Sequence, residues 1–294
     1  MSANQSSEVC VFNRITGQST TQLTIPNRVN YRNKLVDLFV TGYPAGGYAD
    51  IYVGSRVYMR FPFGVNSSTL IQSPTTKIAG LGGFGYFIKN ILKDESLFPN
   101  AAEDEEIVVN LSAAATEIDA YYLQCQGGDV TSHTVAGGSD YPTKPFIDIF
   151  TYTATAAGAG QQITNEVVPT GLALLDSNRR ISPTKQFTLY SLVADYVSSG
   201  SNYTTYNRLH VYDEENELFT PLDHSGLEIN IPSNTNDIQY VFFVNEYFTV
   251  NPPYTFNPNH LVTLLTDVSS VTGTGSTLYL YLMGIKKNVG GGGG

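Results

Sequence analysis

The side chains best suited to catalysis or metal binding are four histidines, and their spacing matches no recognisable metal-ligand motif. They are His133, His210, His224 and His260. The chain contains no His-Glu-x-x-His motif, and no two histidines have the spacing of metal ligands on one helix or hairpin. His210 alternates with the apolar residues on either side, which predicts a structural or solvated position on one face of a strand. The chain also lacks the Gly-x-Ser-x-Gly sequence that surrounds the nucleophilic serine of many hydrolases.

Two acidic runs and two glycine motifs are the other candidate ligand sites. The acidic runs, residues 103–106 and 213–217, lack the spaced oxygen ligands and the turn glycine of a calcium loop. Residues 213–216 lie between two strand-like segments, which predicts a charged hairpin turn. Residues 82–85 and 273–275 do not complete the glycine fingerprint of a dinucleotide site. The sequence therefore predicts no catalytic residues, no cofactor and no metal ligands, and we expect that the protein is not an enzyme.

Cysteine usage indicates neither a disulfide framework nor a metal site. The two cysteines, Cys10 and Cys125, are too few for the disulfide framework of a small secreted domain. Cys125 ends the strand-like run 121–125, so we expect it to be a buried free thiol.

The composition is that of a β protein. Only 14% of the residues are charged, against about 25% in typical domains. Thr, Ser, Asn, Gly and Tyr take their place, and these residues suit strands and tight turns better than helix surfaces. The chain has 20 Tyr but no Trp. Most tyrosines lie in strand-like runs, and Tyr203 and Tyr206 are the better candidates for a sugar-binding surface.

The charge is negative overall but positive near both ends. The net charge of −10 repels phosphate backbones, which argues against direct nucleic-acid binding. The basic residues near the ends are Arg14, Arg28, Arg32, Lys34, Lys286 and Lys287. We interpret these ends either as surfaces that face an anionic partner or as ordinary solvated termini. The first residues lack the apolar core of a signal peptide, and no run approaches the ~20 apolar residues of a membrane span. We therefore expect synthesis in the cytoplasm without export.

Strand patterns fill both halves of the chain, on either side of a break of small residues at 154–162. The expected strands are 34–41, 51–61, 107–111, 117–126 and 146–155 before the break, and 163–168, 186–193, 208–212, 227–231, 239–250 and 278–285 after it. The apolar spacing of residues 88–95 predicts a short helix. A second helix is expected at 258–266, because Asn257 is a good N-cap and Pro258 suits the first helical position. Short strands without βαβ alternation predict antiparallel sandwiches or barrels.

This layout resembles that of the double jelly-roll major capsid proteins of tailless, membrane-containing icosahedral phages. The resemblance covers residues 31–289 and rests on two tandem all-β halves, short inserted helices, polar loops and an acidic body. It implies two tandem jelly-roll β-barrels with a few short inserted helices. The expected organisation is an N-terminal arm (1–30), a first jelly roll (31–157), a second jelly roll (158–289) and a flexible glycine tail (290–294).

The resemblance also implies a function and partners. It implies a structural virion protein that is made in the host cytoplasm and assembles as homotrimeric, pseudo-hexagonal capsomers of an icosahedral shell. The partners would be other copies of the chain and, through the basic ends, lipids of an internal membrane, with no direct contact to nucleic acid and no small-molecule substrate. Two alternatives stay open. One is a β-sandwich spike or adhesin module that binds a receptor or glycan. The other is a β-sandwich hydrolase that uses His210, His224 or His260, because triad residues can lie far apart in sequence.

Overall fold

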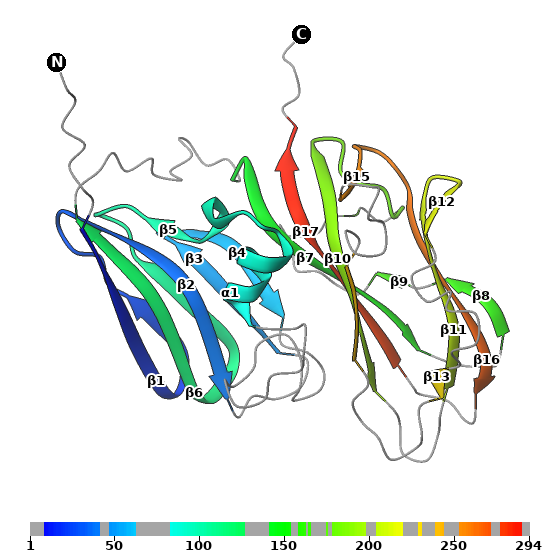
Figure 1. Cartoon of the computed structure of the whole chain (residues 1–294), viewed down its shortest axis with the longest axis horizontal. Coiled ribbons are helices and arrows are strands. Elements are labelled where there is room, and N and C mark those ends of the chain that lie inside the picture. The colour runs from blue at the N-terminus through cyan, green and yellow to red at the C-terminus, as the bar shows by residue number, and fades with distance from the viewer. Residues whose placement is uncertain are drawn as a thin grey trace, which may run out of the picture. The chain divides into compact units, whose positions relative to one another are not determined.

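Strands dominate the described residues of both halves of the chain, and every helix among these residues is short (Figure 1). The computed structural model describes residues 9–41, 47–62, 83–126, 141–153, 158–162, 164–165, 175, 178–197, 204–219, 229–230, 239–243, 253–271 and 277–289. Within these residues no helix is long and apolar enough to cross a membrane. The chain divides into two compact units, Met1–Lys144 and Pro145–Gly294. The expectation of an all-β chain with two tandem β units and a few short helices is confirmed.

The first unit contains one sheet and a short helical insertion. Its elements are β1 (Val9–Ile25), β2 (Tyr31–Thr41), β3 (Tyr48–Val53), β4 (Arg56–Pro62), α1 (Phe84–Tyr86), the π-helix η1 (Phe87–Ile91), the 3-10 helix η2 (Glu95–Leu97), β5 (Asn100–Ala101) and β6 (Ile107–Gln126). The sheet order is β4-β3-β6-β2-β5, and β1 pairs with β6. Residues 9–25, expected in an N-terminal arm, therefore form a strand of this unit.

The sheet curls because β6 folds back along its own length. β1 follows all of β6, from the pair Val9↔Gln126 to the pair Ile25↔Ile107. The next strand starts at Tyr31, which lies opposite Gln126 again. Residues 26–30 join the two strands and can span at most about 20 Å, whereas a straight β6 would be about 60 Å long. The two ends of β6 must therefore lie close together, which gives a curled, barrel-like sheet.

The bend lies where β1 and β6 lose their regular pairing. The register passes from Thr20↔Ala115 to Gln22↔Asn110, so β6 carries extra residues at this point. These residues include Ser112 and two alanines, whose small side chains allow a tight bend, and Ser19 of β1 has a positive φ of 49°. Beyond the bend β6 changes its second neighbour, pairing with β2 over 117–126 and with β3 over 107–111. Two strands that we expected to be separate, 107–111 and 117–126, are thus one bent strand.

The expected single strand at 51–61 is instead a hairpin of two strands, β3 and β4. β3 and β4 pair antiparallel, with Val53 opposite Arg56. Gly54 occupies the turn with a φ of +58°, a conformation that costs glycine little. The register also shifts within the hairpin, so that Tyr58 is fully buried and its hydroxyl donates to the Leu97 carbonyl oxygen over 2.8 Å.

The helical insertion adds aromatic rings to the core of the first unit. The expected helix at 88–95 is present, but it starts at Phe84 and ends at Ile91. Phe84 packs edge-on against Phe61 of β4, with ring centres 5.8 Å apart, and against Phe98 at 6.2 Å. Such aromatic contacts bury large apolar areas and fix the insertion on the sheet.

The second unit is built from two sheets. Its strands are β7 (Thr143–Thr153), β8 (Gly158–Gln162), β9 (Thr164–Asn165), β10 (Lys185–Val197), β11 (Thr204–Asp213), β12 (Asn216–Phe219), β13 (Ile229–Asn230), β14 (Gln239–Phe243), β15 (Tyr254–Phe256), β16 (Val262–Val271) and β17 (Thr277–Asn288). One sheet has the order β14-β10-β17-β7-β9, with β15 on β10. The other has the order β12-β11-β16-β8, with β13 on β11. Residues 154–155, 163, 166–168, 227–228, 231 and 244–250 of the expected strands lie outside the described residues.

The break at 154–162 lies inside the second unit. The strand before it, β7, belongs to one sheet, and β8 belongs to the other. The break therefore marks a passage between two sheets, and the compact units divide at 144/145 instead of the expected 157/158.

The expected helix at 258–266 is wrong. Asn257 and Pro258 precede a turn in which Asn259 has a φ of 64°, and β16 begins at Val262. β16 pairs with β11 from Asp213↔Val262 to Thr204↔Val271. Its Val and Thr residues favour strands, and pairing in the sheet outweighs the local helix signal.

Candidate functional site

Two of the four candidate histidines can be placed, and only one has a described side-chain partner. His210 lies in β11 opposite Leu265 of β16. His133 and His224 lie outside the described residues. His260 lies in the turn before β16, and its Nδ1 is 2.8 Å from Oδ1 of Asp213.

Asp213 is the centre of a small polar cluster in the second unit. Its side chain is buried, and the hydroxyl of Tyr254 donates to its second oxygen over 2.6 Å. Burial, together with the nearby Asp213 carboxylate, raises the pKa of Tyr254 to about 12. The hydrogen bonds satisfy both carboxylate oxygens, as a buried acid requires.

The neighbouring turn is held by a second acidic residue. Glu214, with a φ of 55°, accepts hydrogen bonds from the Leu261 backbone N–H over 3.0 Å and from Arg180 over 2.9 Å. These two bonds lower the pKa of Glu214. The charged hairpin turn expected at 213–216 is confirmed, since β11 and β12 pair on either side of it.

The described contacts of this cluster join the end of β11 to β15 and to the turn before β16. An Asp–His pair is part of a catalytic triad only when the second ring nitrogen reaches a nucleophile. Within the described ranges no hydroxyl or thiol hydrogen-bonds to His260. The described residues likewise contain no group of three or more His, Cys, Asp or Glu that could hold a metal ion.

The two cysteines form a disulfide, so the expected free thiol at Cys125 is wrong. Cys10 of β1 and Cys125 of β6 lie directly opposite each other, with Cα atoms 4.0 Å apart. They are 115 residues apart in the sequence, and only the strand register brings them together. The bond ties the start of β1 to the end of β6.

The basic residues near the ends differ in their surroundings. Arg14 makes two-pronged hydrogen bonds to Asp119, with its Nη2 2.8 and 2.9 Å from the two carboxylate oxygens. The Arg28 guanidinium lies 4.3 Å from the centre of the Tyr31 ring. Lys287 is exposed, whereas the Lys286 side chain is buried, which corrects the expectation of two exposed lysines near the C-terminus.

Lys286 belongs to a buried charged region of the second unit. Its ammonium lies 4.9 Å from the centre of the Phe146 ring. Asp148, two residues along β7, is fully buried, and burial raises its pKa to about 7, although the charge of Lys286 opposes this rise. No motif in the sequence marks Asp148, because its burial depends on the packing of β7 against its neighbours.

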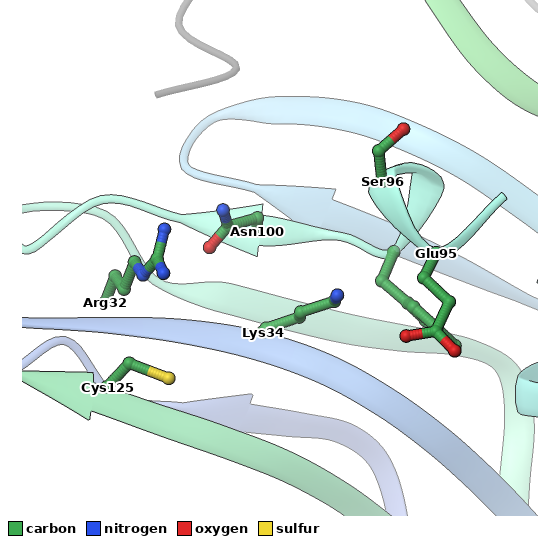
Figure 2. A pocket seen from close by; sticks show the side chains of 7 residues that line it. Arg32, Lys34, Glu95, Ser96, Asn100 and Cys125 are labelled. Atoms are coloured by element: carbon green, nitrogen blue, oxygen red, sulfur yellow. The ribbon is translucent and has the colours of Figure 1, made fainter. Parts of the chain in front are cut away.

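The first unit has a cavity of about 200 Å³ beside β2 and β5 (Figure 2). Arg32 and Lys34 enter it from β2, Asn100 from β5 and Cys125 from β6, while Glu95, Ser96 and Phe98 come from the insertion. Arg32 and Lys34 are two residues apart on one strand, so they share a face of the sheet. Both are basic residues near the N-terminus in the sequence, whereas no local pattern marks Asn100 and Glu95, which reach the cavity only through tertiary folding.

Comparisons with known proteins give structural matches only. No family model and no curated protein matches the sequence. The solved structures that match include the major capsid protein P2 from bacteriophage PM2, at 9% identity, covering 97% of this chain and 100% of that chain with a TM-score of 0.45. A second is Broad Bean Stain Virus, at 9% identity, covering 94% of this chain and 88% of that chain with a TM-score of 0.28. A third is PNGF-II, at 12% identity, covering 91% of this chain and 59% of that chain with a TM-score of 0.25. The first is a phage major capsid protein, the class that the sequence layout resembles.

Proposed function

We propose that the protein is a major capsid protein that assembles as homotrimers into pseudo-hexagonal capsomers of an icosahedral shell. The observation that carries the proposal is the tandem arrangement of two compact all-β units in one chain. Each unit, Met1–Lys144 and Pro145–Gly294, would be a jelly roll. Three chains with two such units each present six similar β units around one axis, which is the geometry of a pseudo-hexagonal building block.

The start of β1 supports self-association. Val9, Val11 and Phe12 are 61%, 53% and 61% exposed in the single chain. β1 pairs with β6 along one edge, and an exposed apolar edge strand is favourable only where another surface covers it. Contact with another copy of the chain would bury these side chains.

The proposal places the protein in a virion after synthesis in the host cytoplasm. Its partners would be neighbouring capsomers and, through basic residues such as Arg28 and Lys287, lipids of an internal membrane. We propose no role in catalysis and no direct contact with nucleic acid.

Size-exclusion chromatography with light scattering tests the assembly directly. A trimer has three times the chain mass of 32.0 kDa, and negative-stain electron microscopy would show capsomers or shells. Val11→Asp should weaken the trimer, because it places a charge on an apolar contact, whereas Gln18→Asp on an exposed polar position of the same strand should not. A stable monomer at assembly concentrations contradicts the proposal, and a monomer that binds glycans would favour the adhesin alternative.

A further inference from the structure

We propose that the cavity beside β2 and β5 binds a phosphate group that carries a proton, either as inorganic phosphate or as a singly protonated phosphate monoester. The site lies within the first unit and does not depend on the proposed assembly. Arg32, Lys34 and Asn100 would make the contacts (Figure 2).

The Lys34 ammonium is a positive charge in the cavity that no described carboxylate neutralises. The Lys34 ammonium lies 5.1 Å from the centre of the Phe98 ring, and no carboxylate among the described residues lies within ion-pair distance of it. Glu95 stands at the rim with a side chain that is 60% exposed, and Lys89 holds its carboxylate at 3.5 Å. A ligand with oxygen acceptors can therefore bind Lys34 without displacing an existing ion pair. A guanidinium such as that of Arg32 suits two oxygens of one phosphate group.

Asn100 selects for a proton on the ligand. Its Oδ1 is buried and has no hydrogen-bond partner among the described residues, and leaving such an acceptor unpaired costs about 1–3 kcal/mol. Lys34 and Asn100 lie opposite each other in the β2–β5 pair, so both side chains reach the same face. A protonated phosphate oxygen can donate to Asn100, while its charged oxygens accept from Lys34 and Arg32. Sulfate has the same shape but carries no proton near neutral pH, so it cannot make the first contact.

The residues around the cavity are held in place before any ligand binds. Asp94 caps the short helix η2 by accepting from the Ser96 backbone N–H over 3.0 Å and from its hydroxyl over 2.6 Å. The disulfide fixes Cys125 on the opposite wall. Binding therefore requires little ordering of the backbone, which favours affinity.

Isothermal titration calorimetry of the folded protein with inorganic phosphate, and separately with sulfate, tests the site. The titrations are done at pH 6, because a phosphate monoester is also partly protonated at this pH. We expect phosphate to bind at least about tenfold more tightly than sulfate, because the buried Asn100 oxygen has no hydrogen-bond donor in the sulfate complex. Lys34→Met should weaken phosphate binding by about tenfold or more through loss of a charge-assisted hydrogen bond. Lys287→Met makes the same change of charge in the second unit and should have no effect.

Vesicles distinguish the two sources of phosphate. Phosphatidate presents a monoester and phosphatidylglycerol a diester without an ionisable proton of this kind. If the protein co-sediments with phosphatidate vesicles but not with phosphatidylglycerol vesicles, and Lys34→Met does not co-sediment, the ligand is a lipid headgroup. If the protein binds inorganic phosphate but neither kind of vesicle, the ligand is soluble. Three results would overturn the proposal. Phosphate and sulfate could bind with equal affinity, the two lysine variants could lose equal phosphate affinity, or neither ion could bind. None of these results would alter the trimer assay, and the wild-type comparison of the two ions remains decisive if Lys34→Met does not fold.

Discussion

The disulfide should dominate the stability of the first unit, and the double variant Cys10→Ser/Cys125→Ser tests this. The bond closes a loop of 115 residues that lies within the first unit. For a loop of that length, the entropy that the cross-link removes from the unfolded chain corresponds to about 5 kcal/mol at 25 °C. Residual structure in the unfolded state reduces this value, so we expect the double variant to lose about 3–5 kcal/mol of unfolding free energy.

Urea denaturation followed by circular dichroism measures the loss, and hydrogen exchange with mass spectrometry assigns each transition to a unit. With a urea dependence of about 2 kcal/mol/M, the midpoint of the first unit should fall by about 2 M. The wild-type protein in a strong reductant should unfold at the same concentration as the double variant. The transition of the second unit should not move, because no described cross-link involves it, and this makes it an internal control.

Two results would refute this reasoning. The first is a midpoint of the first unit that is the same in the oxidised wild type and the double variant. The second is the titration of two free thiols in the denatured, unreduced protein, which would mean that Cys10 and Cys125 are not bonded.

Buried positions of the second unit give two more expectations. The pKa of Asp148 is raised to about 7 from about 3.9 in the unfolded chain, so up to about 4 kcal/mol of stability is present below pH 4 and is lost as the pH rises through 7. Urea midpoints measured from pH 4 to pH 8 should fall with pH in the wild type and much less in Asp148→Asn; parallel slopes would contradict the burial of this acid. Gly284→Ala would drive its Cβ against the Thr188 carbonyl oxygen and to 2.7 Å from the Phe187 ring, so it should destabilise the second unit by about 3 kcal/mol or more. Gly54→Ala, at a turn position with a φ of +58° where the new Cβ would lie 3.3 Å from a Glu105 carboxylate oxygen, should cost the first unit about 1–2 kcal/mol, and equal losses in thermal unfolding would argue against the close approach at Gly284.

Local sequence patterns predicted the strands well where alternation and turn residues agree. The acidic turn at 213–216 was predicted because charged residues interrupt two apolar, alternating runs, and Glu214 indeed closes that hairpin. The helix at 258–266 failed for the opposite reason. Its N-cap and proline signals are local, and the pairing of β16 with β11 contributes more stability than a short isolated helix can.

Which side chains face the core, and where a hairpin turns, were less predictable than the strands themselves. Apolar and polar side chains alternate so regularly over residues 51–61 that the sequence indicated one strand. In the structure Gly54 allows a two-residue turn, and the register shift within the hairpin buries Tyr58. A glycine in an alternating run is a signal for such a turn, but only the pairing of β3 with β6 shows which side chains face the core.

Composition and alternation by themselves determined that this is an all-β protein in two parts, because strand propensity and side-chain period are local properties of the chain. They also marked Arg32 and Lys34 as unusual basic residues in an acidic protein. Only the tertiary structure decided that Cys10 forms a disulfide with Cys125, that Asp148 is buried, and that Asn100 and Lys34 line one cavity. Each of these depends on the register between distant strands, and register is set by the packing of the whole sheet, which no local pattern specifies.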